Sequence, residues 1–218
     1  MNTIKYVLLD VAGTLINKPE LYPTISKSLS KFGYNLDENF IEQQHKLLTE
    51  LIKFPDNTDQ TFYKHFNQEL LYALGIEPSE ELVNHIYTSC KKLKWHICED
   101  STEFLNSISL PKGILSNWDL TLEAKLKEFF PDVSFNNIFG SAQMQASKPS
   151  QLFFNKALKM IDLDPREILY IGDSIKLDIA PGKKHGLNTI LIDRNNIFKN
   201  FKGVRVTSFN EVTKNFEL

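Results

Sequence analysis

The feature that most constrains the fold is an alternation of short apolar segments and helical segments, which begins near residue 101 and continues to the C-terminus. Each apolar segment has only four or five residues, which is typical of buried strands. Strands that alternate with helices pair in parallel, so the pattern predicts an α/β fold with helices on both faces of a sheet. The predicted strands are residues 113–116, 137–140, 168–172, 189–192 and 204–207.

The residues before this region show a different pattern. Residues 4–9 are mostly apolar and end at Asp10, which predicts one further buried strand followed by a turn. Residues 17–94 instead contain four successive segments with apolar residues at helical spacing, and we expect no strand between them. The loop at residues 54–57, between two of these helices, is either a simple turn or a substrate contact.

This order of elements predicts two domains. We expect a Rossmann-like core with a parallel sheet, built from residues 1–16 and 96–218, and an α-helical domain of residues 17–95 inserted after the first strand. The length agrees with an unequal pair, because 218 residues exceed one typical domain of about 150 residues without reaching two.

The composition excludes several classes of protein. Lys and Arg number 25 and Asp and Glu 27, so the formal net charge of −2 argues against a polybasic protein that binds nucleic acid or membrane surfaces. No segment is long and apolar enough for a signal sequence or a membrane span. Two cysteines, Cys90 and Cys98, are too few for a disulfide framework. So few cysteines are typical of a protein in a reducing compartment. We therefore expect a cytoplasmic protein with no nucleic-acid or membrane partner, and no feature indicates its oligomeric state.

Polar residues follow several of the predicted strands at their carboxyl ends. Ligands bind at this edge of an open parallel sheet, so we expect these side chains to gather there. Carboxylate oxygens hold a hard divalent cation such as Mg²⁺, whereas hydroxyl, amide and lysine groups hold phosphate oxygens. The sequence thus predicts a joint site for a divalent cation and an anion. Its members are Asp10, Ser116, Asn117, Lys148, Asp173 and Asp178.

Each of these residues alone has an ordinary structural explanation. Asp10 could form a turn, and the segment at Asp173 and Ser174 could cap a helix. Lys148 and Asp178 could be solvated surface residues. The combination favours a functional site, because all of these residues are expected at one edge of the sheet.

The order and spacing of these residues resemble the four motifs of the haloacid dehalogenase (HAD) superfamily. The matching segments are DVAGTL at residues 10–15, LSN at 115–117, Lys148–Pro149, and Gly172–Asp173–Ser174 with Asp178. The third and fourth motifs together are specific for this superfamily, whereas the second motif alone is not. The resemblance covers essentially the whole chain and implies a hydrolase whose inserted helices form a cap domain.

The resemblance implies a role for each matching residue. Asp10 would be the nucleophile that attacks phosphorus and forms an aspartyl-phosphate intermediate. Asp10 and Asp173 would bind Mg²⁺ together with the backbone carbonyl of Ala12, and Asp178 would support the ion directly or through water.

The remaining matching residues would serve the phosphoryl group. Ser116, Asn117 and Lys148 would hold its oxygens and offset their charge, which is the main task in phosphoryl transfer. The cap would close over the substrate and exclude water. The implied activity is that of a Mg²⁺-dependent phosphatase whose partner is a small phosphorylated metabolite.

Ala12 is the one departure from the family pattern. In phosphatases of the family, the residue two positions after the nucleophile is a second aspartate, which protonates the leaving group and then activates water. A methyl group can do neither, and such proton transfer contributes ~10²–10⁴ in rate. In a phosphatase of this sequence the proton would come from the substrate, from water or from a cap residue such as His45, Glu50 or His65.

Phosphonoacetaldehyde hydrolase is an alternative, because its first motif also reads Asp-x-Ala-Gly-Thr. That reaction needs a cap lysine that forms a Schiff base with the aldehyde. The chain has no surrounding lysine motif typical of those enzymes, although cap lysines are numerous. The candidates are Lys18, Lys27, Lys31, Lys46, Lys53 and Lys64.

Two further alternatives remain. A 2-haloacid dehalogenase also lacks the second aspartate, but it works without metal and needs a cap arginine, and this chain has no arginine before Arg166. Dehalogenation is therefore the weakest of the enzymatic interpretations. The other alternative is a HAD-fold protein that binds a phosphorylated ligand or a protein partner with little turnover. Against it, a scaffold has no physical need for Asp10, Lys148, Asp173 and Asp178 together.

Overall fold

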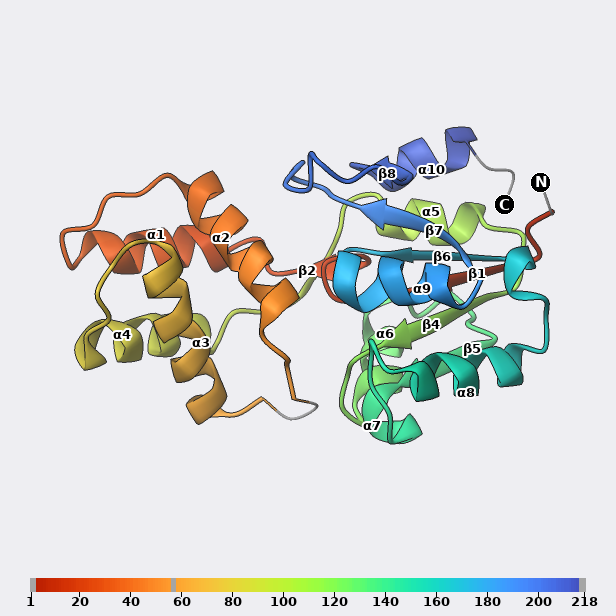
Figure 1. The fold of residues 1–218 in the computed structure, drawn as a ribbon, viewed down its shortest axis with the longest axis horizontal. Helices are drawn as coiled ribbons and strands as arrows, with labels where there is room; N and C mark the ends of the chain where they lie inside the picture. The colour runs from red at the N-terminus through yellow and green to blue at the C-terminus, as the bar shows by residue number, and fades with distance from the viewer. Residues whose placement is uncertain (1–2, 56–57, 216–218) are drawn as a thin grey trace. The chain divides into compact units, whose positions relative to one another are not determined.

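The computed structural model describes residues 3–55 and 58–215, with residues 1–2, 56–57 and 216–218 outside the description (Figure 1). The chain divides into two compact units, one of residues up to Asn17 and from Ile97 onward, and one of Lys18–His96. The second half of the loop at residues 54–57, a candidate substrate contact, lies outside the described residues.

The first unit is built on a six-stranded sheet in which every pair of neighbouring strands is parallel, so the predicted α/β fold is confirmed. The strand order is β5-β4-β1-β6-β7-β8. All six predicted strands are present, with ends shifted by at most two residues. Their bounds are β1 Tyr6–Leu9, β4 Lys112–Ser116, β5 Asn137–Gly140, β6 Ile168–Gly172, β7 Asn188–Ile192 and β8 Arg205–Val206.

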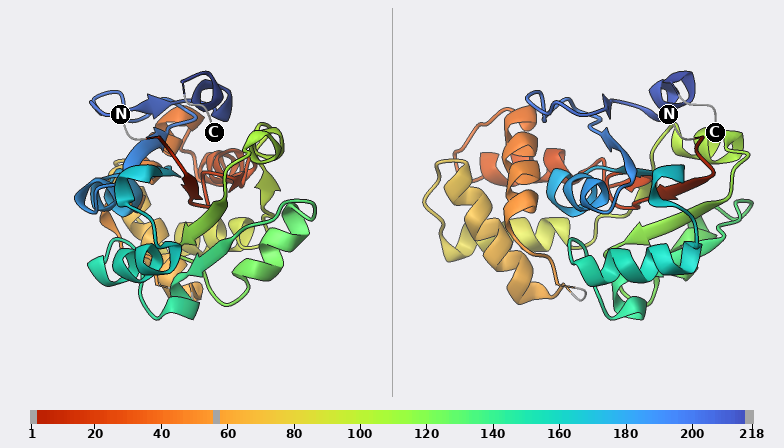
Figure 2. Two further views of the ribbon diagram at one scale, coloured as in Figure 1. Left: turned by 90° about the vertical axis from the view of Figure 1, so that its right-hand side faces the viewer. Right: turned by 45° about the vertical axis from the view of Figure 1, so that its right-hand side comes forward.

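Helices cover both faces of this sheet (Figure 2). One face carries α8 and α9, and α8 packs Phe153 and Phe154 against β6 in a cluster of buried apolar residues. The other face carries α5 and α10, where the rings of Phe104 and Phe209 stack with centroids 4.1 Å apart. The helices of this unit are α5 Ser101–Ser107, α6 Leu122–Phe129, α7 Ser141–Met144, α8 Gln151–Ile161, the 3₁₀ turn η1 Pro165–Glu167, the π-helical turn η2 Ile175–Ile179, α9 Ala180–Lys184 and α10 Phe209–Asn215.

Burial on both faces explains why the central strands are apolar throughout. All four residues of β1 and all five of β6 are buried. A strand with helices above and below it has no solvent face, so its sequence is a continuous apolar run rather than an alternation. The carboxyl ends of these two strands, where the chain becomes polar, hold the candidate site.

The second unit consists of the four predicted helices, α1 Leu21–Ser30, α2 Glu38–Leu51, α3 Gln60–Ala73 and α4 Glu80–Cys90. Side chains of Asp37, Asp59 and Ser79 cap the last three of them by accepting backbone N–H bonds. The helices enclose their own apolar core, which includes Ile41 and Leu70. Among the described residues, no helix is both long enough and apolar enough to cross a membrane.

Two short strands were not expected from the sequence. They are β2 Ile16–Asn17 and β3 His96–Ile97, which pair at the two points where the chain passes between the units. Two residues are too few to show the alternation that identifies a strand in a sequence.

Candidate active site

The sheet register brings the ends of β1 and β6 to the same level. Leu9 pairs with Ile171 across the two strands, and the Asp10 N–H donates to the Ile171 carbonyl at 2.9 Å. Asp10 and Asp173 therefore lie side by side, just beyond the carboxyl ends of the neighbouring strands β1 and β6. Ser116 is the last residue of β4, which pairs with β1 on its other side. The predicted gathering at the carboxyl edge is present for these three residues.

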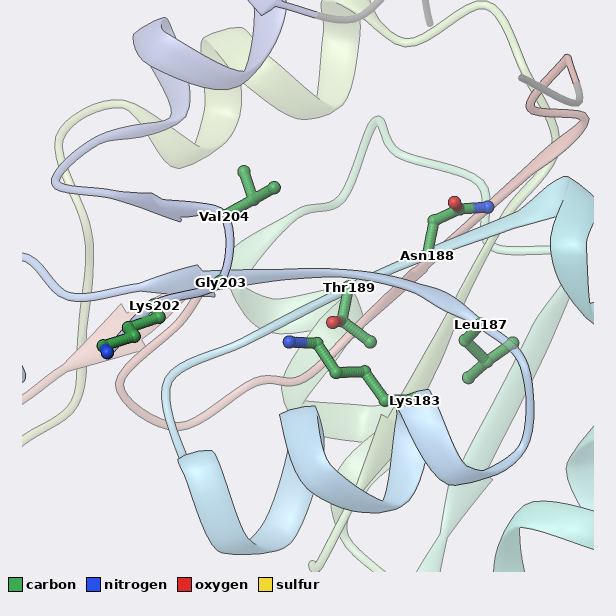
Figure 3. Close-up of a pocket in the computed structure, with 7 residues that line it drawn as sticks. All are labelled: Lys183, Leu187, Asn188, Thr189, Lys202, Gly203 and Val204. Atoms are coloured by element: carbon green, nitrogen blue, oxygen red, sulfur yellow. The ribbon is translucent and has the colours of Figure 1, made fainter. Parts of the chain in front are cut away.

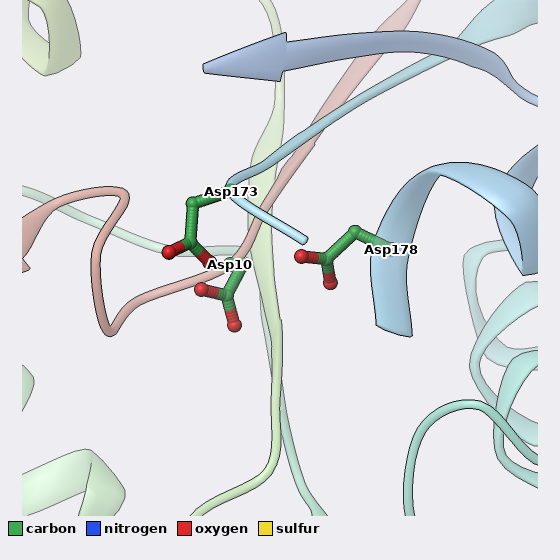
Figure 4. A group of neighbouring side chains, drawn as sticks. All are labelled: Asp10, Asp173 and Asp178. Carbon is green, nitrogen blue, oxygen red and sulfur yellow. The ribbon is translucent and has the colours of Figure 1, made fainter. Parts of the chain in front are cut away.

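Three carboxylates meet at this edge. Asp10, Asp173 and Asp178 each have an oxygen within 4.8 Å of those of the other two (Figure 4). Asp10 and Asp178 are 4% and 1% exposed, so water screens little of their mutual repulsion.

This set of three carboxylates fits a hard divalent cation. When all four are ionised, the three carboxylates and Lys148 together carry a net charge of −2, which a divalent ion neutralises. Oxygen ligands that leave room for water and substrate oxygens match the preferences of Mg²⁺. Asp10, Asp173 and Asp178 are the residues that would hold it, and the Ala12 carbonyl remains a predicted ligand.

Lys148 lies between two of these carboxylates. Its Nζ is 2.6 Å from Asp10 Oδ1 and 2.6 Å from Asp178 Oδ1, and its side chain is 3% exposed. Burial by itself lowers the pKa of Lys148, but the two carboxylates outweigh burial and raise its pKa above the ordinary lysine value. The ammonium group is therefore charged at neutral pH.

Asp178 enters the site from η2, the turn that follows β6. Its Oδ2 accepts the Ser174 N–H at 3.0 Å, and its Oδ1 accepts from Lys148 and from the Tyr170 hydroxyl. Burial raises the pKa of Asp178 to about 7, Lys148 opposes this shift, and the charges of Asp10 and Asp173 add to it.

Gly172 makes room for this carboxylate. A Cβ at Gly172 would lie 2.5 Å from Asp178 Oδ2 and 2.6 Å from Asp178 Cβ, which is closer than real contacts allow. Glycine is thus required by the close approach of η2 to the end of β6.

Gly172→Ala is expected to lower the free energy of unfolding by about 2–3 kcal/mol, because the methyl group forces a buried carboxylate away from its partners. Denaturant unfolding measures this change. The matched control is Gly140→Ala at the end of β5, where the new methyl would meet the flexible side chain of Leu122 at 3.2 Å. Equal stability of the two variants would contradict the steric argument.

The carboxylate of Asp10 is oriented by two hydroxyl groups. Ser116 Oγ donates to Oδ1 at 3.0 Å, and Thr14 Oγ1 donates to Oδ2 at 3.2 Å. Both hydroxyl-bearing residues are buried. Thr14 belongs to the first motif, but the sequence alone assigned it no contact.

Asn117 contacts Lys148 rather than the carboxylates. Its Nδ2 donates to the Lys148 carbonyl at 3.1 Å, and its Oδ1 accepts the Lys148 N–H at 2.7 Å. The two bonds fix the backbone that carries the lysine. Direct binding of phosphate by Asn117 stays a prediction.

Ala12 lies in the turn that follows Asp10, where it forms an isolated bridge with Ile16. Arg194 supports this turn, because its Nη2 donates to the Thr14 carbonyl at 2.9 Å and lies 2.9 Å from Asp100 Oδ1. The sequence did not predict the contacts that Tyr170 and Arg194 make with this site. Tyr170 stands inside an apolar strand, and the only signal is that a buried phenol needs a polar partner.

The helical unit contains candidates for the proton donor and the Schiff-base lysine. His45 packs edge-on against Tyr22 and Phe66, and burial, with a smaller effect of Lys46, lowers its pKa to about 3. Its ring is therefore neutral at pH 7 and poorly suited to donate a proton. Among the candidate lysines, Lys18 lies 4.7 Å from the Trp95 ring centroid. Roles for Glu50, His65 and the lysines stay predictions.

A cavity of about 540 Å³ lies elsewhere in the core unit (Figure 3). It opens at the amino-terminal end of β7, near Asn188 and Thr189, whereas the carboxylates lie at the carboxyl edge of the sheet. None of the predicted site residues lines it. The full lining is Lys183, Leu187, Asn188, Thr189, Lys202, Gly203 and Val204.

Comparison with known proteins agrees with this fold. Glyceraldehyde 3-phosphate phosphatase of Methanocaldococcus jannaschii is 26% identical over 205 residues, covering 87% of this chain and 85% of that protein. The rhythmically expressed gene 2 protein of Drosophila melanogaster is 24% identical over 221 residues, covering 88% and 84%. The structure of the HAD-hydrolase YfnB from Bacillus subtilis, bound to magnesium, matches with a TM-score of 0.66 at 17% identity, covering 100% of both chains.

The sequence pattern of haloacid dehalogenase-like hydrolases matches residues 7–192, which is most of the chain. The match begins in β1 and ends with β7, so it includes the whole carboxyl edge where the charged side chains meet. A shared fold and a shared sequence pattern over this length leave one conclusion: the chain belongs to the haloacid dehalogenase-like hydrolases.

Proposed function

We propose that this hydrolase is a Mg²⁺-dependent phosphatase that acts on a small phosphorylated metabolite. The observation that carries the proposal is the position of Lys148, which lies 2.6 Å from the carboxylate of Asp10 within a group of three carboxylates. A nucleophile, a cation for phosphoryl oxygens and oxygen ligands for a metal are then adjacent. These are the parts that phosphoryl transfer to a carboxylate requires.

The first step is attack of an Asp10 carboxylate oxygen on phosphorus. The new O–P bond forms an aspartyl-phosphate, and the bond to the leaving oxygen breaks with its electron pair, which then takes a proton. Lys148 offsets charge on the phosphoryl oxygens, and Ser116 and Thr14 keep the carboxylate oriented. Bound Mg²⁺ would reduce the repulsion between the anionic nucleophile and the anionic phosphoryl group.

The second step is hydrolysis of the aspartyl-phosphate. Water attacks phosphorus, the bond to the Asp10 oxygen breaks, and inorganic phosphate leaves. In this chain neither step has an acid or base at position 12, because Ala12 offers only its methyl group and backbone. We therefore propose that solvent or the substrate supplies the leaving-group proton.

The relatives support a phosphate monoester as the substrate. The protein of Methanocaldococcus jannaschii, and a 24% identical protein of Pyrococcus furiosus, are glyceraldehyde 3-phosphate phosphatases. We propose that residues 1–16 and 96–218 act as the catalytic domain and that residues 17–95 act as the cap that selects among such small esters. The cap helices carry their own apolar core, as an independent lid requires.

Ala12→Asp tests the missing proton donor. The wild type is expected to hydrolyse aryl phosphates, whose leaving groups need no proton, much faster than alkyl phosphates. The aspartate is expected to raise turnover of alkyl phosphates by about 10²-fold or more and to change turnover of p-nitrophenyl phosphate little. The measurement is kcat across a series of leaving groups at saturating Mg²⁺.

Ala12→Asn is the matched control, since it adds similar bulk without a group that can act as a general acid or base. If Ala12→Asp and Ala12→Asn give the same dependence on the leaving group, position 12 is not the place of the missing proton transfer. Absence of turnover in the wild type with gain of turnover in Ala12→Asp would instead favour a ligand-binding protein.

A further inference from the structure

Tyr170 places a hydroxyl group at the centre of the charged cluster. It is the third residue of β6 and is completely buried, with its ring edge-on to Phe154. Its Oη lies 2.5 Å from Asp178 Oδ1, 3.3 Å from Lys148 Nζ and 3.3 Å from the Leu115 carbonyl. No motif that the chain shares with its family assigns this hydroxyl a function.

The donors and acceptors in the cluster fix the direction of these hydrogen bonds. A phenol has one proton, and the shortest distance directs it to Asp178 Oδ1. The Tyr170 oxygen is then an acceptor for Lys148. The three N–H groups of Lys148 thus have three acceptors, which are Asp10, Asp178 and Tyr170.

This arrangement leaves Lys148 without a spare proton for a ligand. To contact a phosphoryl oxygen, the ammonium must release one of its three acceptors. Asp178 can release the ammonium, because its Oδ1 also accepts from the Tyr170 hydroxyl and its Oδ2 accepts the Ser174 N–H. When Lys148 turns from Asp178 to a ligand, Asp178 still keeps the Tyr170 hydrogen bond, so its buried charge is not left without a side-chain donor.

We infer that Tyr170 is a positioning residue that allows Lys148 to be shared between Asp178 and a bound phosphoryl group. The inference rests on the proposed function. Without the hydroxyl, Asp178 loses a side-chain donor, so its buried carboxylate holds the Lys148 ammonium more tightly and competes with the substrate for it. Phosphate should then bind more weakly, although the ring still fills its place in the core.

Tyr170→Phe tests this inference, with Tyr6→Phe as the matched control. Tyr6 is also buried, stands in the neighbouring strand β1, and donates to Asn137 Oδ1 at 2.8 Å, away from the carboxylates. Both variants remove one buried hydroxyl group, so both are expected to lower the melting temperature. Only Tyr170→Phe is expected to weaken binding of inorganic phosphate in the presence of Mg²⁺, by about tenfold.

Two measurements distinguish a failure of the inference from a failure of the proposed function. Calorimetric binding of inorganic phosphate is compared among the wild type, Tyr170→Phe and Tyr6→Phe, and kcat and KM are measured alongside. A tenfold loss of phosphate affinity in Tyr170→Phe alone supports the inference even if the wild type shows no turnover, an outcome that would overturn only the phosphatase activity. Equal phosphate affinity in Tyr170→Phe and wild type, or equal losses in both variants, overturns the inference even in an active enzyme.

Discussion

Asp10→Asn is expected to abolish turnover, with kcat at least about 10³-fold below the wild type. The amide has nearly the shape of the carboxylate and still accepts hydrogen bonds at one oxygen, so the fold should survive. It cannot displace a leaving group from phosphorus, because its nitrogen lone pair is delocalised and its oxygen carries no full charge. The measurement is kcat with an aryl phosphate and Mg²⁺, combined with mass spectrometry of protein quenched in acid. An aspartyl-phosphate should appear in the wild type alone.

Asp193→Asn is the control for this experiment. Asp193 occupies the equivalent place after β7 and is equally buried, at 4% exposed. Its carboxylate accepts from the backbone N–H groups of Ile197 and Phe198 and pairs with Arg205. This variant is expected to lose stability and to keep turnover. Activity that persists in Asp10→Asn would remove Asp10 from the role of nucleophile.

Lys148→Met is expected to damage both stability and catalysis. The methionine fills the space of the lysine stem but leaves two buried carboxylates without their shared cation. Breaking a buried ion pair from one side costs about 3–5 kcal/mol of unfolding free energy. Loss of a positioned charge from phosphoryl oxygens costs about 10²–10³ in kcat. Unfolding is measured in chelator, and kcat with Mg²⁺.

The loss of stability in Lys148→Met is also expected to depend on pH. The pKa of Asp178 is already raised to about 7, and removal of Lys148 takes away the interaction that opposes the shift. A carboxyl whose pKa is higher in the folded state than in the unfolded state favours folding below its unfolded pKa, and this contribution disappears as the pH rises through the folded pKa. The Lys148→Met variant should therefore be more destabilised at pH 8 than at pH 5.

Lys156→Met is the matched control for Lys148→Met. Lys156 in α8 is partly buried and donates to the Met144 carbonyl at 2.7 Å. Replacing it should cost less than about 1 kcal/mol, with no pH signature and no change in kcat. A similar loss in the two variants would show that Lys148 is an ordinary core lysine.

The sequence by itself determined the fold class and the order of the elements. Continuous apolar runs such as residues 168–172 reveal strands buried on both faces, and their carboxyl ends reveal where ligands bind, because parallel strands share one functional edge. Asp10, Lys148, Asp173 and Asp178 could be grouped for this reason before any distance was known. The absence of a carboxylate at Ala12 is equally a property of the sequence.

Only the tertiary structure decided which atoms meet. Lys148 and Asp178 are 30 residues apart in the sequence, and their side chains meet at 2.6 Å. This contact depends on the glycine at the end of β6 and on the two hydrogen bonds of Asn117 to the Lys148 backbone. Tyr170 could not be recognised, because inside an apolar strand a phenol is indistinguishable from a packing residue until its oxygen is located. Local patterns report which face and which edge a residue occupies, whereas hydrogen-bond partners and pKa values follow from distances between segments that the sequence keeps far apart.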